Sequence, residues 1–174
     1  GLAQGCAFVL AGFVSILIHE LGHALTIRKF GLPTQITLTT FGGYATHPAG
    51  ILSRSKSFLV TAAGPAIQII FGLLVWLIYI NTSMPSDHIE YFVFILAAIS
   101  IIWAIFNCLP IFPLDGGQML ASILGPRRAK ILHMTGIICA LIIGLIGLKF
   151  GYMLVLVFMG LFAWQNYQML QQNR

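Results

Sequence analysis

The chain has 174 residues, of which 59% are hydrophobic and only 7% carry a charge. This balance excludes an ordinary soluble domain and indicates an integral membrane protein embedded in the lipid bilayer. The net charge of +5 at pH 7 does not indicate a nucleic-acid partner, because the basic residues cluster at the ends of apolar runs, where they act as topology signals. Cys6, Cys108 and Cys139 lie in apolar segments without CxxC spacing, which predicts core residues rather than thiolate ligands. No pattern in the sequence indicates an oligomeric state.

Hydropathy predicts an all-α polytopic membrane protein that forms a single domain over residues 1–174. Each apolar stretch is near the length of about 20 residues that crosses a hydrocarbon core of about 30 Å. The last two stretches are predicted as separate helices joined by a turn at Lys149-Phe150-Gly151, because one continuous helix would overshoot any bilayer. The five predicted transmembrane helices cover residues 3–27, 57–80, 91–109, 131–148 and 151–168.

The positive charges predict the orientation of these helices. With five crossings, every Lys and Arg except Lys149 falls on one side of the membrane, and the positive-inside rule makes that side cytoplasmic. Glu20 then lies about 26 Å along the first helix, at a rise of 1.5 Å per residue. We therefore expect a multi-pass protein of the plasma membrane, with the end of the first helix that carries Glu20, where the candidate active site described next lies, toward the cytoplasmic side.

The first predicted helix contains the motif HExxH at residues 19–23. Residues four apart share a helix face, so His19 and His23 can present two imidazole nitrogens to one ion. Zinc chemistry needs a third ligand and an open position for water, whose proton Glu20 would take. HExxH also occurs by chance on helices without a metal. A charge near the bilayer centre costs about 2.5–3.5 kcal/mol, however, so ionisable residues in a membrane helix favour a functional role.

A small membrane-associated β-hairpin is predicted after the first helix. Residues 36–41 alternate apolar residues with threonines and end at a Gly-Gly pair, which we expect to form the turn; an ordinary interfacial loop is the alternative. As a hairpin, the backbone of Thr37, Leu38 and Thr39 would pair with an extended peptide by strand addition. Proline at Thr37 or Thr39 would then impair the activity of the site more than alanine, because proline removes a backbone donor.

The second predicted helix contains the sequence AGPAIQ at residues 63–68. Gly64 allows close approach to a neighbouring helix, and Pro65 is expected to kink or locally open this one. Gln68 must find a polar partner in the bundle. A structural role and a catalytic role both remain open for these three residues.

A third metal ligand is predicted where the third helix ends, in NCLPIFPLDGG at residues 107–117. Two prolines open the backbone at membrane depth, and Asp115 offers a carboxylate on the side where the HExxH motif lies. His47 and His133 share that side and are the alternative ligands, although a surface or helix-end position is predicted for both. Asn107 is expected to contact a substrate carbonyl or a developing oxyanion, and hydrogen bonding between helices is the alternative.

Four motifs together resemble the site-2 protease family of intramembrane zinc metalloproteases. They are HELGHA at 19–24, FGG at 41–43, AGP at 63–65 and NCLPIFPLDGG at 107–117. The resemblance implies zinc held by His19, His23 and Asp115, with Glu20 as the general base and Asn107 at the substrate. It also implies that the substrate is a transmembrane segment of another membrane protein, cut during regulated proteolysis.

The chain departs from that family in two places. The asparagine that usually follows the Gly-Pro motif is replaced by Gln68, and the helix that commonly precedes the HExxH helix is absent, which indicates truncation or a five-span variant. Two other functions remain open. One is a catalytically inactive homologue that binds membrane substrates, and the other is a membrane metal carrier, although the central parts of the second, fourth and fifth helices lack the His, Asp or Glu that a transport path needs.

Overall fold

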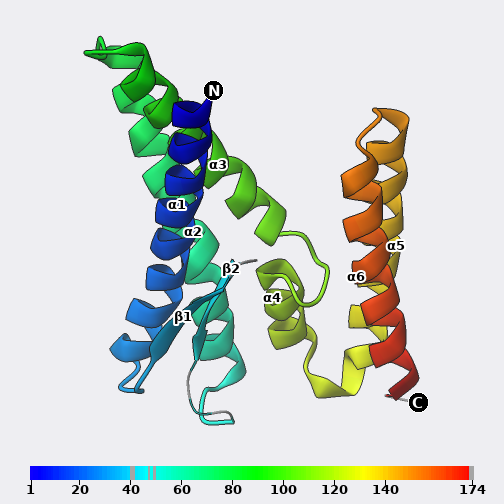
Figure 1. The fold of residues 1–174 in the computed structure, drawn as a ribbon. Helices are drawn as coiled ribbons and strands as arrows, with labels where there is room; N and C mark the ends of the chain where they lie inside the picture. The colour runs from blue at the N-terminus through cyan, green and yellow to red at the C-terminus, as the bar shows by residue number, and fades with distance from the viewer. Residues whose placement is uncertain (40–41, 47, 49, 173–174) are drawn as a thin grey trace. The chain divides into compact units, whose positions relative to one another are not determined.

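The computed structural model describes residues 1–39, 42–46, 48 and 50–172. Its long helices are α1 (Leu2–Lys29), α2 (Arg54–Asn81), α3 (Asp87–Asn107), α5 (Ala129–Lys149) and α6 (Met153–Gln172). Between them lie the strands β1 (Gln35–Thr39) and β2 (Gly42–Thr46), the short helix α4 (Asp115–Leu124) and the 3-10 turn η1 (Pro126–Arg128). Figure 1 shows these elements in chain order by colour.

The five predicted transmembrane helices are confirmed within the described part of the chain. α1, α2, α3, α6 and the stretch Pro126–Lys149 are each long and apolar enough to cross a membrane. The helix ends differ from the predicted ones by one to four residues. Most ends extend past the apolar run, whereas α3 stops at Asn107, before its predicted end, and α6 begins at Met153, after its predicted start. The fold is therefore that of an all-α, multi-pass membrane protein with one small hairpin.

The chain divides into two compact units. The first contains Gly1–Ile51 and Ala62–Phe106, and the second contains Leu52–Thr61 and Asn107–Arg174. α1, the hairpin, α3 and most of α2 thus belong to the first unit, whereas α4, α5 and α6 belong to the second. A single domain over the whole chain stays a prediction.

Small side chains fill the interior of the first unit, while large apolar side chains such as Leu73 and Leu77 are exposed. Ala11, Ala97 and Ala104 are fully buried. This distribution is typical of membrane helices, because lipid is as apolar as a leucine side chain and association depends on close backbone packing. The helices of this unit therefore present their bulky faces to lipid.

Glycines set the packing of α2 against its neighbours. A Cβ added at Gly22 of α1 would lie 2.5 Å from the carbonyl oxygen of Ala63, and one added at Gly72 of α2 would lie 2.8 Å from Cγ1 of Ile101 on α3. Both distances are too short for a real side chain. α2 thus approaches both α1 and α3 at positions where a side chain is missing.

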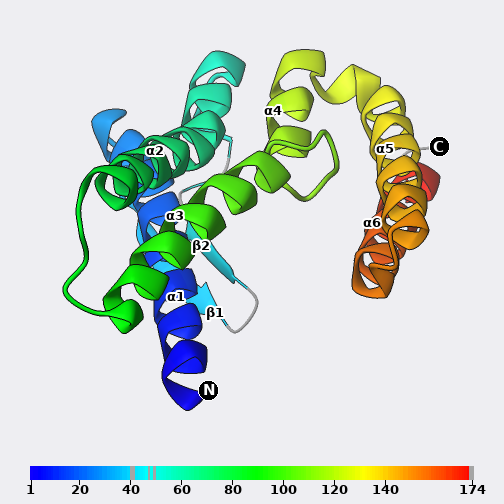
Figure 2. The same cartoon turned by 90° about the horizontal axis from the view of Figure 1, so that it is seen from above.

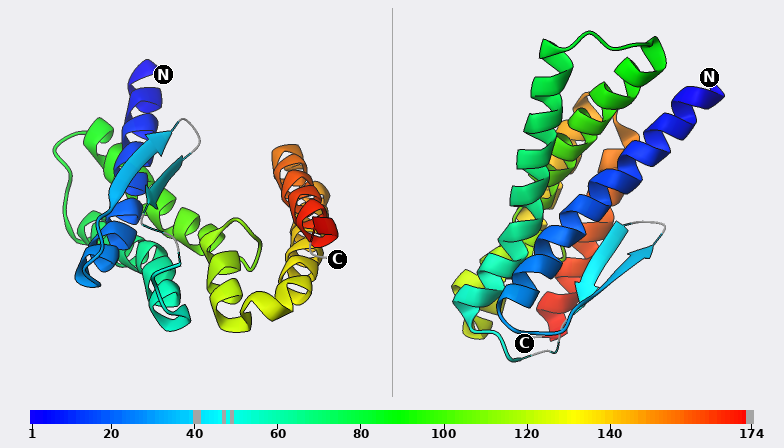
Figure 3. Two further views of the ribbon diagram at one scale, coloured as in Figure 1. Left: turned by 90° about the horizontal axis from the view of Figure 1, so that it is seen from below. Right: turned by 90° about the vertical axis from the view of Figure 1, so that its left-hand side faces the viewer.

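The two strands pair as an antiparallel hairpin that packs on α1 (Figure 3). The register runs from Gln35 opposite Thr46 to Thr39 opposite Gly42. The predicted hairpin is confirmed, but its predicted turn is wrong, because both glycines of the Gly-Gly pair lie in β2. Residues 40–41 connect the strands and lie outside the described residues. Gly43 is required by its close contact with Glu20 of α1, described below, whereas Gly42 has a φ of +149°.

α5 and α6 form a helical hairpin in the second unit (Figure 2). The turn predicted at Lys149-Phe150-Gly151 is confirmed, since α5 ends at Lys149 and Gly151 has a φ of +80°, which favours glycine. Farther along, a Cβ at Gly147 would lie 2.8 Å from Cγ1 of Val155, so the two helices are in close contact there.

α4 was not predicted from the sequence, because its second and third residues, Gly116 and Gly117, disfavour helix. These glycines are needed for packing. A Cβ at Gly116 would collide with the carbonyl group of Cys108, and one at Gly117 with the backbone around Phe112. The segment after α3 thus folds back onto the first turn of α4, and the Phe112–Pro113 peptide bond within it is cis. The apolar spacing of Leu120 and Leu124 was the available helix signal.

Candidate metal centre

His19 and His23 lie on one face of α1, as their spacing predicts. Their Nε2 atoms are 3.0 Å apart and their rings meet edge to face, with centroids 4.7 Å apart. Both residues are buried, and so is Glu20 between them in sequence. The structure therefore brings together all three ionisable residues of the HExxH motif in the interior of the first unit.

The two imidazoles fit a zinc ion. Two nitrogens that each lie about 2.0–2.1 Å from a tetrahedral ion are separated by about 3.3 Å. The observed separation of 3.0 Å is within a few tenths of an ångström of this value. Neutral imidazoles are also among the ligands that zinc prefers.

Gln68 of α2 provides the hydrogen-bond partner of His19. Nδ1 of His19 lies 2.9 Å from Oε1 of Gln68, whose Nε2 donates to the carbonyl oxygen of Ser15 at 3.2 Å and to its Oγ at 2.8 Å. Ser100 of α3 donates to Ser15 Oγ at 3.0 Å. Gln68, Ser15 and Ser100 are all fully buried. The expectation that Gln68 finds a polar partner is confirmed. The sequence analysis missed the two serines, although a polar residue inside a membrane helix is itself a signal.

At two glycines, the backbone of a neighbouring element lies directly against a side chain of the HExxH motif. A Cβ at Gly64 of α2 would collide with the imidazole of His23, so the predicted close approach at Gly64 is confirmed. A Cβ at Gly43 of β2 would lie 2.6 Å from Cγ of Glu20 and 2.9 Å from its Oε1. The glycine that was predicted to form the hairpin turn therefore makes room for the carboxylate side chain of Glu20.

Asp115 belongs to the second unit, where it is the first residue of α4 and is buried. The predicted role of Asp115 as third zinc ligand stays a prediction.

Asn107 is the last residue of α3 and is half-buried. Its predicted contact with substrate also stays a prediction.

Cys6 and Cys108 are exposed and Cys139 is half-buried, so the prediction that the cysteines are core residues is wrong. The large lipid-facing surface of a membrane protein explains why apolar neighbours in sequence did not indicate burial.

His133 and His47 were the alternative ligands. His133 lies near the beginning of α5 and is buried in the second unit, with Nδ1 3.1 Å from Oδ1 of Asn166; of the predicted surface or helix-end position, the surface part is wrong. Asn166 also donates to the carbonyl oxygens of Phe112, at 2.6 Å, and Phe162, at 2.9 Å. His133 and Asn166 thus tie α5 and α6 to the segment that precedes Asp115. His47 lies outside the described residues.

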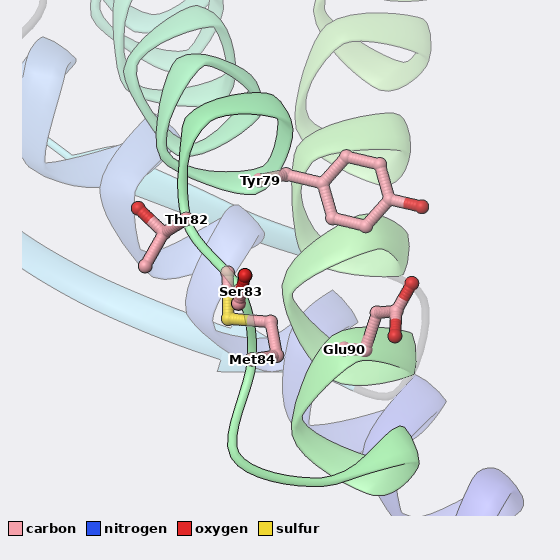
Figure 4. A pocket seen from close by; sticks show the side chains of 5 residues that line it. All are labelled: Tyr79, Thr82, Ser83, Met84 and Glu90. Atoms are coloured by element: carbon pink, nitrogen blue, oxygen red, sulfur yellow. The ribbon is translucent and has the colours of Figure 1, made fainter.

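A cavity of about 400 Å³ lies at the turn between α2 and α3 (Figure 4). Its lining consists of Tyr79, Thr82, Ser83, Met84 and Glu90. One carboxylate and three hydroxyls form no set of metal ligands of the kind that zinc prefers. The HExxH region is therefore the better candidate for the functional site.

The fold and the site define a class: a multi-pass membrane protein whose first helix carries a metallopeptidase-type pair of histidines with an adjacent glutamate. The family model described as Peptidase family M50 matches residues 7–86 and 77–150. The chain therefore belongs to Peptidase family M50, the site-2 protease family.

Known relatives support the same assignment. The chain is 29% identical over 160 residues to zinc metalloprotease MJ0392 of Methanocaldococcus jannaschii. The aligned region covers 87% of this chain and 45% of that protein. The chain is 33% identical over 107 residues to stage IV sporulation protein FB of Bacillus subtilis, covering 60% and 36%. The solved structure of the site-2 protease from Methanocaldococcus jannaschii matches with a TM-score of 0.71 at 26% identity, covering 94% of this chain and 77% of that one. The chain spans less than half the length of the curated relatives it matches.

Proposed function

We propose that this protein is an intramembrane zinc metalloendopeptidase that cleaves transmembrane segments of other membrane proteins in regulated proteolysis. The observation that carries the proposal is the pair of buried imidazoles on a membrane helix, with Nε2 atoms 3.0 Å apart and a buried glutamate beside them. Membership of Peptidase family M50 supports it. Buried ionisable groups in a membrane helix are expensive, and catalysis accounts for their presence.

In this proposal His19 and His23 hold the zinc ion through Nε2 and Asp115 supplies the third ligand. Three protein ligands leave a position open, as catalytic zinc sites require. When bound, zinc supplies Lewis-acid activation of a water molecule and of the peptide carbonyl. Support for Asp115 comes from its carboxylate, which is one of the ligand types that zinc binds, and from its place in the NCLPIFPLDGG stretch that resembles the site-2 protease family.

Glu20 is the proposed general base. Its carboxylate takes a proton from water as the water oxygen attacks the carbonyl carbon of the substrate, and it returns that proton to the amide nitrogen as the C–N bond breaks. Asn107 is proposed to donate a hydrogen bond to the carbonyl oxygen as negative charge develops on it. The contact with Gly43 limits the positions that Glu20 can take.

The hairpin is the proposed docking edge for an unwound substrate strand, and its register identifies the backbone groups available. Opposite residues in an antiparallel pair either exchange backbone hydrogen bonds or do not. Thr39 and Gly42 are opposite each other and only two positions separate them in sequence, so we infer that they are a hydrogen-bonded pair. The two types alternate along an antiparallel ladder, so Thr37 also bonds inward to β2. The backbone groups of Ile36 and Leu38 therefore point to the free edge of β1.

This register changes the proline test predicted from the sequence. The N–H groups of Thr37 and Thr39 pair with β2, so proline there would disrupt the hairpin itself. Leu38 keeps its proposed role in strand pairing, because its backbone faces away from β2. A proline at Leu38 removes a donor from the free edge and leaves the pairing within the hairpin intact.

The proposed membrane is the plasma membrane, with the metal site toward the cytoplasmic side. The distribution of Lys and Arg supports this orientation, since all but Lys149 fall on one side of five crossings. The zinc site would then receive water from the cytoplasm.

The experiment that tests this function is co-expression of the protein with candidate single-span membrane proteins, followed by detection of fragments. Glu20→Gln should abolish the fragments while the purified variant keeps its zinc, because general-base catalysis is worth about 10²–10⁴-fold and Glu20 is not a ligand. Glu90→Gln, at an exposed glutamate in the first turn of α3, is the matched control and should cleave normally. Fragments that persist in Glu20→Gln would refute the mechanism. Zinc binding without cleavage of any candidate would favour an inactive homologue.

A further inference from the structure

We propose that Gln68 is a positioning residue that holds His19 in the single tautomer able to bind zinc through Nε2, and that Ser15 fixes Gln68 in the orientation this requires. The inference rests on the proposed function, in which His19 is a zinc ligand. It concerns three helices of the first unit, α1, α2 and α3, whose polar side chains meet in the buried interior.

The orientation of the Gln68 amide follows from its partners. The carbonyl oxygen of Ser15 can only accept a hydrogen bond, so the amide group that faces it at 3.2 Å must be the NH₂ group. The same NH₂ group lies 2.8 Å from Oγ of Ser15. A reversed amide would place two acceptors against each other in a buried site, which is costly. Oε1 of Gln68 must therefore face His19.

The tautomer of His19 follows in turn. Oε1 of Gln68 can only accept, so Nδ1 of His19, 2.9 Å away, must carry the hydrogen. A neutral imidazole has one hydrogen, which leaves a lone pair on Nε2. Nε2 is the atom that faces His23 at 3.0 Å. The hydrogen bond on one side of the ring thus determines the nitrogen that is free to bind a metal on the other.

Ser100 of α3 lies outside this control. It donates to Oγ of Ser15 at 3.0 Å, whereas the carbonyl oxygen of Ser15 by itself is enough to exclude the reversed amide of Gln68. Removing the hydroxyl of Ser100 should therefore leave the orientation of Gln68 unchanged.

The test compares zinc affinity among purified full-length variants, measured by competition with a chelator of known affinity. Gln68→Met keeps the length of the side chain but removes the acceptor, and it should weaken zinc binding about 10–100-fold, as loss of a hydrogen bond to a metal-bound imidazole commonly does. Gln68→Glu, as a neutral carboxyl, keeps an acceptor for Nδ1 and a donor for the carbonyl oxygen of Ser15, so it should bind zinc more tightly than Gln68→Met. Ser100→Ala, which removes a buried hydroxyl without touching Gln68, is the matched control and should leave zinc affinity unchanged.

A second readout separates positioning from a merely structural role. The absorption spectrum of the Co²⁺-loaded protein reports the ligand field, so it should shift in Gln68→Met and stay unchanged in Ser100→Ala. If Gln68→Met binds zinc as tightly as the unmodified protein with an unchanged cobalt spectrum, or if Gln68→Glu is as weak as Gln68→Met, the positioning role is overturned. If the unmodified protein itself binds no zinc, the proposed function fails instead.

Discussion

Alanine at Gly43 is expected to displace Glu20, the proposed general base, while leaving the proposed metal ligands in place. The added Cβ would lie 2.6 Å from Cγ of Glu20 and 2.9 Å from both Oε1 of Glu20 and Cδ2 of Leu38. Ordinary van der Waals contact begins at about 3.4 Å, so the strand and the glutamate must separate by about 0.8 Å. Cγ of Glu20 lies in the middle of the side chain, which cannot swing away without moving the carboxylate.

A displacement of about 1 Å in a catalytic geometry costs about 10²-fold in rate. Gly43→Ala should therefore lower kcat by about this factor at unchanged zinc content, measured with a purified substrate in detergent or liposomes. Gly12→Ala is the matched control, because a Cβ at Gly12 of α1 meets nothing within 4 Å. If Gly43→Ala cleaves at the normal rate with its zinc intact, the contact between β2 and Glu20 does not constrain catalysis.

Two further predictions concern the ligand set and the docking edge. Asp115→Ala should lower the zinc content of the purified protein, whereas Asp87→Ala, at an exposed carboxylate in the first turn of α3, should not; full and equally tight occupancy in Asp115→Ala would remove it from the ligand set. Leu38→Pro should slow cleavage more than Leu38→Ala without loss of zinc, because only proline removes the N–H at the free edge of β1. Equal cleavage by the two Leu38 variants would mean that substrate is held elsewhere.

The sequence was enough to predict those parts of the fold whose cause is local. An apolar run of about 20 residues has to become a helix in a bilayer, because lipid offers no partner for its backbone groups. The five long helices and the turn at Gly151 follow from this constraint. His19 and His23 share a face for an equally local reason, since their spacing alone places them on one side of α1.

The parts that could not be predicted depend on contacts between distant segments. Gly43 resembles a turn residue in sequence, and only the packing of β2 on α1 shows that it makes room for Glu20. Ser15 and Ser100 are single serines in apolar helices, 85 positions apart, yet their hydroxyls are hydrogen-bonded. α4 was missed because its two glycines have low helix propensity. Glycine is required at both positions because the backbone around Cys108 and Phe112 leaves no room for a side chain there.

The contact between Gly64 and His23 has a consequence for how the protein is made. The HExxH motif leaves the ribosome before α2, and roughly 60 further residues must follow before α2 is complete, which takes about 3–12 s at about 5–20 residues per second. Throughout this interval His19 lacks Gln68, and no backbone from α2 covers His23. α1 must therefore wait with polar side chains that pure lipid accepts poorly. The helix that carries the HExxH motif is thus fully stabilised in the bilayer only by the helix that is made after it.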